Sequence, residues 1–208
     1  MFQISDKKII FWDFDGVIKD SVMAKGETFA ELFGREDEYM HSRVLKHHCS
    51  HAGLPRAEKI VIYLSWAQNT QSQKNIKLWE KKFNKIVVKK VCQSPWVPGA
   101  LQYLQENYQR QYFVLVSATP QKEMEQILEQ LQICNFFKRI YGHPNKKNDV
   151  IANTLGNLGL KPSDAVMLGD SVADYSAALE NNVKFGLRRT NLNVDISLSN
   201  RDFEFRRF

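Results

Sequence analysis

Residues 9–16, with the sequence Ile-Ile-Phe-Trp-Asp-Phe-Asp-Gly, decide the fold of this chain. The first four are apolar and consecutive, which is typical of a strand buried on both faces of a parallel sheet. Asp13 and Asp15 follow two residues apart, so in extended backbone their side chains point to the same side. Gly16 then permits a sharp turn. The segment predicts a buried strand whose carboxyl end presents two carboxylates.

Two further apolar runs of strand length also end at polar residues. Phe-Val-Leu-Val at 113–116 stops at Ser117, and Ala-Val-Met-Leu at 165–168 stops just before Gly169 and Asp170. Both runs predict strands of the same buried kind. Two weaker strand candidates are residues 139–141 and 183–185.

Helical patterns separate these strands. One is expected to begin at a cap formed by Thr119 and Pro120 and to reach Leu131. A second is expected after a cap at Asp149, and Gly159 is expected to end it. A third is expected over residues 171–179. Strands alternating with helices from about residue 96 onward predict a doubly wound, Rossmann-like α/β core with a parallel sheet.

Residues 17–95 do not follow this alternation and read as a helical insertion after the first strand. The turn-rich stretch at residues 95–99, Pro-Trp-Val-Pro-Gly, suits a boundary. We therefore expect an α/β core over residues 1–16 and 96–208, and a separate α-helical unit over 17–95. The expected helices of that unit cover residues 23–33, 39–51, 56–67 and 74–88.

Composition indicates a folded protein of the cytoplasm. The chain has 208 residues, of which 43% are hydrophobic and 25% charged. It has no apolar run of about 18 residues, so we expect no membrane partner, and its start lacks the basic and apolar regions of a signal peptide. Three cysteines at wide spacings, Cys49, Cys92 and Cys134, fit reduced thiols rather than disulfides or a zinc cluster.

The net charge of +6 raises nucleic acid as a partner, but the excess is local. Residues 74–90 contain seven lysines and one acid, Glu80. The apolar residues of this stretch fall on one helical face, and Lys77, Lys81 and Lys85 fall on another. We interpret it as an amphipathic helix with a solvated lysine face, the alternative being a polyanion-binding patch. The apolar face consists of Ile76, Trp79, Phe83 and Ile86.

The strand ends carry the chemistry. Ligands of open parallel sheets bind outside the carboxyl ends of the strands, where Asp13, Ser117 and Asp170 are expected. The acidic cluster that these aspartates form with Asp15 and Asp174 requires a cation, and an oxygen-only ligand set with open positions suits Mg²⁺. A phosphate group would then be met by Ser117, the backbone N–H of Ala118 and a lysine, Lys146 or Lys147. Phosphoryl transfer needs mainly such positioning and charge neutralisation.

Four segments in order resemble the motifs of the haloacid dehalogenase superfamily. They are Asp13-Phe14-Asp15-Gly16-Val17-Ile18 followed by Asp20-Ser21, Val114-Leu115-Val116-Ser117-Ala118-Thr119, Gly142-His143-Pro144-Asn145-Lys146-Lys147, and Gly169-Asp170-Ser171 with Asp174. The insertion after the first motif resembles the helical cap of the phosphoglycolate phosphatase and β-phosphoglucomutase branch. The resemblance covers nearly the whole chain.

The resemblance implies a role for each matched residue. Asp13 would be the nucleophile that forms an aspartyl-phosphate, and Asp15 the general acid and base. Ser117 and Lys147 would bind the transferring phosphoryl group, with Lys146 as the alternative lysine.

The resemblance also implies a Mg²⁺ site. Asp13, the backbone carbonyl of Asp15, and Asp170 would hold the ion. Asp174 would act through water or by orienting Lys147.

The same branch implies a cap residue that meets the remote group of the substrate. Residues 53–59, Gly-Leu-Pro-Arg-Ala-Glu-Lys, are similar to the loop concerned, and Arg56 would bind a carboxylate or second phosphate. The alternative for Arg56 is a surface arginine at the start of a helix. Phosphonate-cleaving relatives have a Schiff-base lysine. Lys59 resembles that residue only in being a lysine of the cap.

We therefore expect a Mg²⁺-dependent phosphatase for a small phosphorylated metabolite, a sugar phosphate or a phosphoglycolate-like acid. A phosphomutase of the same family is the alternative. A further alternative is a receiver-type phospho-switch, which would not need a helical insertion or Asp15. Another is nucleic-acid binding, which would depend on the lysines of residues 74–90. The presence of Asp15 disfavours dehalogenase chemistry.

Overall fold

The computed structural model describes residues 4–51, 54–200 and 202–208. Within these residues, six parallel strands form one sheet in the order β3-β2-β1-β4-β5-β6. The strands are added outward on one side of β1 as far as β3, and then on its other side from β4 to β6. This is the doubly wound arrangement, and it confirms the predicted fold class. The strands are β1 (Ile9–Trp12), β2 (Tyr112–Pro120), β3 (Arg139–His143), β4 (Ala165–Gly169), β5 (Lys184–Arg188) and β6 (Phe203–Phe205).

The register of β1 aligns the strand ends that matter for function. Trp12, its last residue, pairs with Leu115 of β2 and Leu168 of β4. The residues that follow these three positions therefore leave the sheet at one edge. The strand is apolar throughout because both of its faces are covered.

Helices cover the two faces of the sheet, and the side chains of β1 alternate between them. Ile10 and Trp12 belong to the core that includes residues of α5 (Ala100–Asn107) and α6 (Gln121–Gln130). Ile9 and Phe11 belong to the core under α7 (Lys147–Leu158) and α8 (Val172–Glu180). This is the three-layer arrangement that the alternating pattern predicts.

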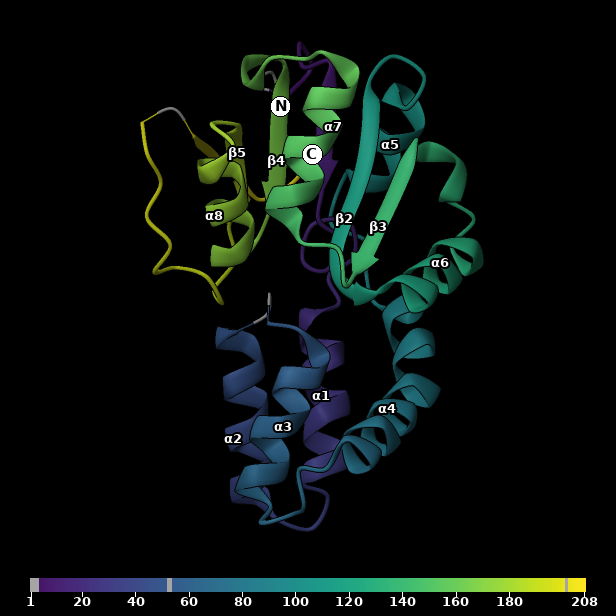
Figure 1. The fold of residues 1–208 in the computed structure, drawn as a ribbon, viewed down its shortest axis with the longest axis vertical. Helices are drawn as coiled ribbons and strands as arrows, with labels where there is room; N and C mark the ends of the chain where they lie inside the picture. The colour runs from purple at the N-terminus through teal and green to yellow at the C-terminus, as the bar shows by residue number, and fades with distance from the viewer. Residues whose placement is uncertain (1–3, 52–53, 201) are drawn as a thin grey trace.

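Four helices lie outside these layers, beyond the carboxyl ends of the strands (Figure 1). Their buried apolar residues continue the core of one sheet face, and among them the ring of Phe29 contacts those of Tyr63 and Phe83. The longest of them, α4, reaches back toward the sheet layer and contacts α6. The four are α1 (Val22–Phe33), α2 (Glu38–Ser50), α3 (Arg56–Trp66) and α4 (Gln73–Gln93).

The chain enters and leaves this helical insertion at one place. The backbone N–H of Asp20 donates to the carbonyl of Pro95 at 2.8 Å, and Lys19 forms an isolated bridge with Trp96. The buried ammonium of Lys19 also lies 4.4 Å from the centre of the Trp96 ring. The two connections therefore run side by side and hold each other.

The predicted elements are confirmed with corrections at their ends. The helix expected from a cap at Thr119 begins at Gln121, because β2 runs past a register irregularity as far as Pro120. The helix expected after Asp149 begins at Lys147, and Asp149 lies in its first turn. Gly159 ends that helix in the left-handed conformation, as expected. The helix α4 is longer than expected. The helix α5 was not expected from the sequence.

The remaining sequence expectations concern the surface and the termini. Lys77, Lys81 and Lys85 are exposed on α4, opposite the buried Ile76 and Phe83. The aromatic residues of the C-terminal stretch pack against the core, and the ring of Phe208 lies 5.1 Å from that of Trp12. The three cysteines are free thiols. Within the described ranges, no helix combines the length and apolar character of a membrane span.

Candidate active site

The loop after β1 brings the first two aspartates to the sheet edge. The backbone N–H of Asp13 donates to the carbonyl of Leu168 at 2.9 Å, which continues the sheet pairing by one residue. Gly16 then turns with φ +78°, and an added Cβ there would lie 2.0 Å from the Oδ2 of Asp170. Only glycine fits this position, because the loop crosses directly against the end of β4.

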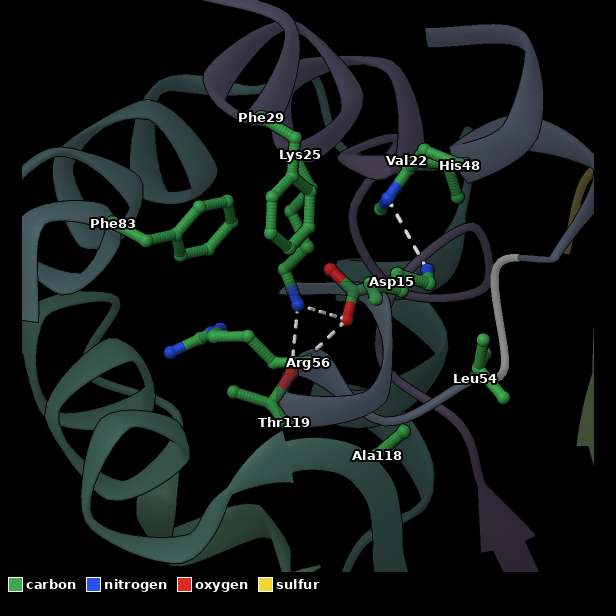
Figure 2. Close-up of a pocket in the computed structure, with 11 residues that line it drawn as sticks. Asp15, Val22, Lys25, Phe29, His48, Leu54, Arg56, Phe83, Ala118 and Thr119 are labelled. Atoms are coloured by element: carbon green, nitrogen blue, oxygen red, sulfur yellow. Dashed lines mark hydrogen bonds and ion pairs between the residues drawn. The ribbon is translucent and has the colours of Figure 1, made fainter. Parts of the chain in front are cut away.

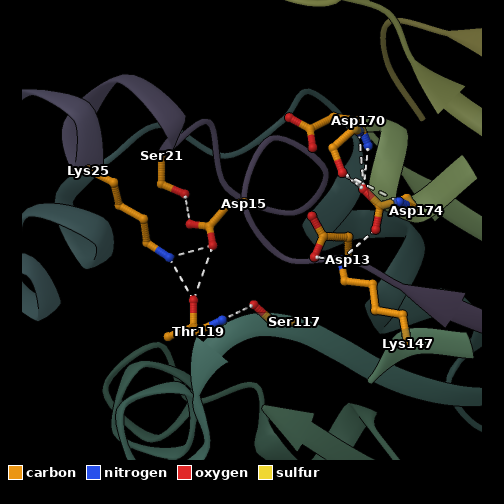
Figure 3. A network of polar contacts seen from close by, with 10 residues as sticks. Asp13, Asp15, Ser21, Lys25, Ser117, Thr119, Lys147, Asp170 and Asp174 are labelled. Carbon is orange, nitrogen blue, oxygen red and sulfur yellow. Dashed lines mark hydrogen bonds and ion pairs between the residues drawn. The ribbon is translucent and has the colours of Figure 1, made fainter. Parts of the chain in front are cut away.

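Three buried carboxylates meet at this edge (Figure 3). Asp13, Asp170 and Asp174 each offer an oxygen, and these oxygens lie within 4.8 Å of one another. The start of α8 fixes Asp174: its Oδ2 accepts hydrogen bonds from the backbone N–H and the hydroxyl of Ser171 at 3.1 and 2.6 Å. This reciprocal capping box satisfies the helix terminus and orients the carboxylate toward Asp13.

Lys147 is the lysine that reaches this group. Its ammonium donates to Asp13 Oδ1 at 2.6 Å and to Asp174 Oδ1. Lys146 is exposed at the position just before α7, so the structure brings Lys147, not Lys146, to the aspartates. Burial lowers the pKa of Lys147, but the two carboxylates raise it by more, and the side chain is therefore a fixed cation.

The acidic group has more negative charge than Lys147 balances. Burial raises the pKa of Asp13 to about 7, against the opposing effect of Lys147. Burial and the neighbouring Asp13 and Asp174 raise the pKa of Asp170 well above its usual value. Three carboxylates against one ammonium leave a net charge that a divalent cation would neutralise. The donors are oxygens only, which fits Mg²⁺.

Asp15 lies in a second polar cluster next to the first (Figure 3). Its carboxylate accepts hydrogen bonds from Ser21 Oγ at 2.6 Å, Lys25 Nζ at 2.5 Å and Thr119 Oγ1 at 3.3 Å. Burial raises the pKa of Asp15, but Lys25 and these hydrogen bonds outweigh it and lower the pKa. The carboxylate of Asp15 is therefore ionised, and it does not belong to the group formed by Asp13, Asp170 and Asp174.

The two remaining core residues of the predicted site lie at the end of β2. Ser117 is buried, and its hydroxyl accepts a hydrogen bond from the backbone N–H of Thr119 at 3.1 Å. Ala118 faces the cavity that lies between the sheet edge and the helical insertion. Both residues lie in the register irregularity of β2, between Val116 and Pro120, which still pair with β3.

That cavity is lined by both parts of the chain (Figure 2). Asp15, Ala118 and Thr119 contribute from the sheet edge, whereas the helical insertion contributes cationic and aromatic residues. The residues from the insertion are Val22, Lys25, Phe29, His48, Leu54, Arg56, Lys59 and Phe83.

Arg56 lines the cavity, but its guanidinium is held by a carboxylate of the sheet layer. Its Nη1 and Nη2 donate to Glu123 Oε2 and Oε1 at 2.6 and 2.5 Å, and Nη1 also donates to Asn84. Both charged side chains are buried, at 7% and 5% exposure. This bidentate pair joins α3 to α6. Gly53, the first residue of the loop predicted to contain Arg56, lies outside the described residues.

Three functional candidates were missed by sequence reasoning. Lys25 and Thr119 hold Asp15, and Glu123 holds Arg56. Lys25 follows Asp15 by ten residues on an amphipathic helix, where a lysine gives no signal of burial. Glu123 lies in the first turn of α6, where an acidic residue is expected for helix stability alone.

Residues 9–187 match the sequence profile of the haloacid dehalogenase-like hydrolases. The chain belongs to this family. The match runs from the first residue of β1 to the fourth residue of β5, and so includes both polar clusters and the whole helical insertion. Membership makes the protein a hydrolase. None of the curated protein sequences matches this chain significantly.

Solved structures of haloacid dehalogenase-like proteins share the fold. The hydrolase YfnB from Bacillus subtilis, bound to magnesium, has a TM-score of 0.73 and 16% identity over 98% of this chain and 96% of its own. A protein from Lactobacillus plantarum assigned as a phosphoglycolate phosphatase has a TM-score of 0.71 and 14% identity, with coverages of 97% and 95%. CbbY from Rhodobacter sphaeroides, in complex with xylulose 1,5-bisphosphate, has a TM-score of 0.70 and 17% identity, with coverages of 96% and 93%.

Proposed function

We propose that this hydrolase is a Mg²⁺-dependent phosphatase of small phosphorylated metabolites. The observation that carries the proposal is Asp13, a buried carboxylate held at 2.6 Å by Lys147 in an acidic group with Asp170 and Asp174. A phosphoryl group beside Asp13 would meet a fixed cation on one side and a metal site on the other. The fold-related proteins from Lactobacillus plantarum and Rhodobacter sphaeroides support a small phosphorylated substrate by their names and bound ligand.

The reaction has two halves, and Asp13 takes part in both. A carboxylate oxygen of Asp13 forms a bond to phosphorus while the ester P–O bond breaks, and the leaving oxygen takes a proton from Asp15. Water then attacks phosphorus and gives a proton to Asp15, the bond to Asp13 breaks, and phosphate leaves. Lys147 neutralises charge beside the phosphoryl group, and Ser117 with the backbone N–H of Ala118 completes its binding site.

Asp13, Asp170 and the backbone carbonyl of Asp15 would hold Mg²⁺, with Asp174 beside them orienting Lys147. When bound, the ion supplies positive charge against the phosphoryl oxygens. The chain's own preparation for it is this cluster of buried carboxylates, in which burial, and after it the neighbouring carboxylates, raise the pKa values of Asp13 and Asp170.

The contacts of Asp15 fit the second half of the reaction directly. An ionised carboxylate can accept a proton from water, and Lys25 keeps Asp15 ionised. In the first half Asp15 has to carry the proton, so its contact with Lys25 has to lengthen when the leaving group arrives. The four-helix insertion, residues 17–95, acts as the cap that covers this step and excludes bulk water.

Phosphate release tests the proposal. Phosphoglycolate, sugar phosphates, nucleotides and phosphonates are incubated with the full chain, with Mg²⁺ and with a chelator. We expect release from a small phosphate ester that stops on chelation and returns with added Mg²⁺. Release that is indifferent to the chelator would contradict the metal site. Isomerisation of a sugar phosphate without phosphate release would identify a phosphomutase instead.

The raised pKa values predict how Mg²⁺ stabilises the protein. Without metal, the protonated form of Asp13 favours the folded state, and this contribution is lost as the pH rises from 3.8 through about 7. Mg²⁺ needs the ionised carboxylates, so protons compete with it below pH 7. At about 100 times its Kd, Mg²⁺ should raise Tm by roughly 5–10 °C at pH 8, with a much smaller rise at pH 5.5.

Differential scanning fluorimetry at the two pH values measures this effect. Asp170→Asn removes one of the three carboxylates and is expected to lose most of the shift at pH 8. Asp149→Asn, an exposed aspartate of α7, is the matched control and should keep it. An equal shift at both pH values would contradict a site made of these carboxylates.

A further inference from the structure

A second cavity lies beside the acidic group, at the end of β5. Its volume is about 360 Å³, which is in the range of sites for small ligands. Asp170 lines this cavity and also belongs to the acidic group, so the cavity adjoins the candidate metal site. We call it the β5 pocket. Among the described residues, its charged lining side chains are Asp20, Asp170, Arg188, Arg189 and Arg206.

Arg189 holds the loop that follows β5. Its Nε donates to Glu204 Oε2 at 2.8 Å. Its Nη1 and Nη2 donate to the backbone carbonyls of Asn193 and Ile196 at 2.6 and 3.0 Å. All three nitrogens of this guanidinium are therefore used within the loop and by β6. Arg206 is exposed, so it adds charge to the pocket without a fixed position. The buried arginine of the pocket is Arg188.

The guanidinium of Arg188 has weak partners for a buried cation. Arg188 is the last residue of β5 and is 8% exposed. Its Nη1 and Nη2 donate to the two carboxylate oxygens of Asp20, both at 3.3 Å, whereas charge-assisted pairs usually lie at about 2.7–2.9 Å. The Asp20 side chain is 50% exposed, so water competes for its oxygens. The Nε of Arg188 is buried and has no acceptor among the described residues.

A small oxyanion would satisfy Arg188 better than Asp20 does. Phosphate and carboxylate groups accept two parallel N–H bonds from one guanidinium. A free ligand can approach to the short distance that Asp20, fixed to its own backbone, does not reach. Asp20 can turn to water at little cost, because an exposed ion pair contributes little stability. Asp170 repels an anion in the pocket, and the Mg²⁺ proposed at Asp170 would offset that repulsion.

We propose that the β5 pocket binds a small oxyanion, a phosphate or carboxylate group, which replaces Asp20 on the guanidinium of Arg188. The oxyanion is either free in solution or the second acidic group of a substrate. The proposal rests on the proposed function in one respect, the Mg²⁺ beside Asp170. The thermal shift at pH 8 tests that metal site separately, so a failure of the metal site is distinguishable from a failure of the pocket.

The Nε–H of Arg188 reports on the pocket directly in a ¹H–¹⁵N NMR spectrum, because a buried N–H is shielded from exchange with water. Its signal is assigned by its loss in Arg188→Lys. Inorganic phosphate is titrated into the full chain with Mg²⁺. We expect a saturable shift of this signal with a Kd on the order of 1 mM, as for two charge-assisted hydrogen bonds. A shift that grows without saturation, or no shift, would overturn the proposal.

Asp20→Asn tests the exchange of partners by the direction of its effect. Removing the charge that competes for Arg188 should lower the Kd for phosphate by about 2- to 5-fold, the range of an exposed ion pair. Asp149→Asn removes an exposed charge from α7 and should leave the Kd unchanged. If Arg188 and Asp20 only link β5 to the helical insertion, Asp20→Asn should not tighten binding. An unchanged or higher Kd in Asp20→Asn would therefore overturn the proposal.

Two inert phosphonates identify the source of the oxyanion through the same signal. The probes are 3-phosphonopropionate and propylphosphonate, which have the same chain length and differ in the carboxylate. Similar Kd values for both probes would support a free oxyanion as the occupant. A Kd at least about 10-fold lower for 3-phosphonopropionate would support the second acidic group of a substrate. Neither probe is turned over, so these results do not depend on phosphate release.

Discussion

Asp13→Asn is expected to abolish phosphate release, with a loss on the order of 10⁴-fold or more in kcat. The amide keeps the size of the side chain but cannot act as the nucleophile. It also weakens the ion pair with Lys147, so circular dichroism has to show that the fold is intact. The measurement is single-turnover phosphate release at saturating Mg²⁺, with the ester that the wild-type enzyme hydrolyses best.

Asp170→Asn is the matched variant, because Asp170 lies in the same acidic group without a nucleophilic role. Its activity should recover in part as Mg²⁺ is raised, since it loses a ligand and not the attacking atom. The activity of Asp13→Asn should stay at background under the same conditions. Recovery of Asp13→Asn at high Mg²⁺ would show that Asp13 only binds metal and would rule out an aspartyl-phosphate.

Glu123→Leu is expected to destabilise the protein by about 3–5 kcal/mol, the cost typical of leaving a buried charge without its partner. In this variant the buried Arg56 would keep, among the described residues, its hydrogen bond to Asn84 and its contact with the Phe83 ring at 4.4 Å. The free energy of unfolding is measured by urea denaturation, with tryptophan fluorescence as the signal.

The double variant Arg56→Met with Glu123→Leu tests whether the lost stability comes from the broken ion pair or from altered packing. Removing both charges should restore most of the lost stability, because an apolar pair can replace a buried ion pair. Glu129→Gln, an exposed position on the same helix, should change stability by less than about 0.5 kcal/mol. A double variant no more stable than Glu123→Leu would contradict the assignment of the cost to an uncompensated Arg56.

The core of the fold could be predicted because its signals are local. Ile9–Trp12 is apolar because the strand is buried, and the strand ends directly before the first aspartate. The end of α7 at Gly159 follows from neighbouring backbone groups. The end of β2 and the start of α7 were harder to predict. A register irregularity in β2 depends on packing against β3, and α7 begins three residues earlier than expected, at Lys147 beside the acidic group.

The helical insertion shows where a single sequence is insufficient. Arg56 and Glu123 each look like an ordinary first-turn residue of an amphipathic helix, and they are 67 positions apart. Their pairing exists only once the first turn of α3 is placed against the first turn of α6. Lys19, Lys25 and Lys59 likewise belong to a lysine-rich chain, so composition does not distinguish these three buried lysines of the described residues from the exposed ones.

The paired connections at Lys19 and Trp96 also have a consequence for how such enzymes diversify. Because the segment between them departs and returns through adjacent hydrogen bonds, its replacement by another segment that keeps the contacts of Ser21 and Lys25 with Asp15 would leave the strand register and the aspartates of the sheet edge unchanged. A lineage could therefore acquire a new substrate by exchanging one contiguous stretch of its gene while retaining its chemistry.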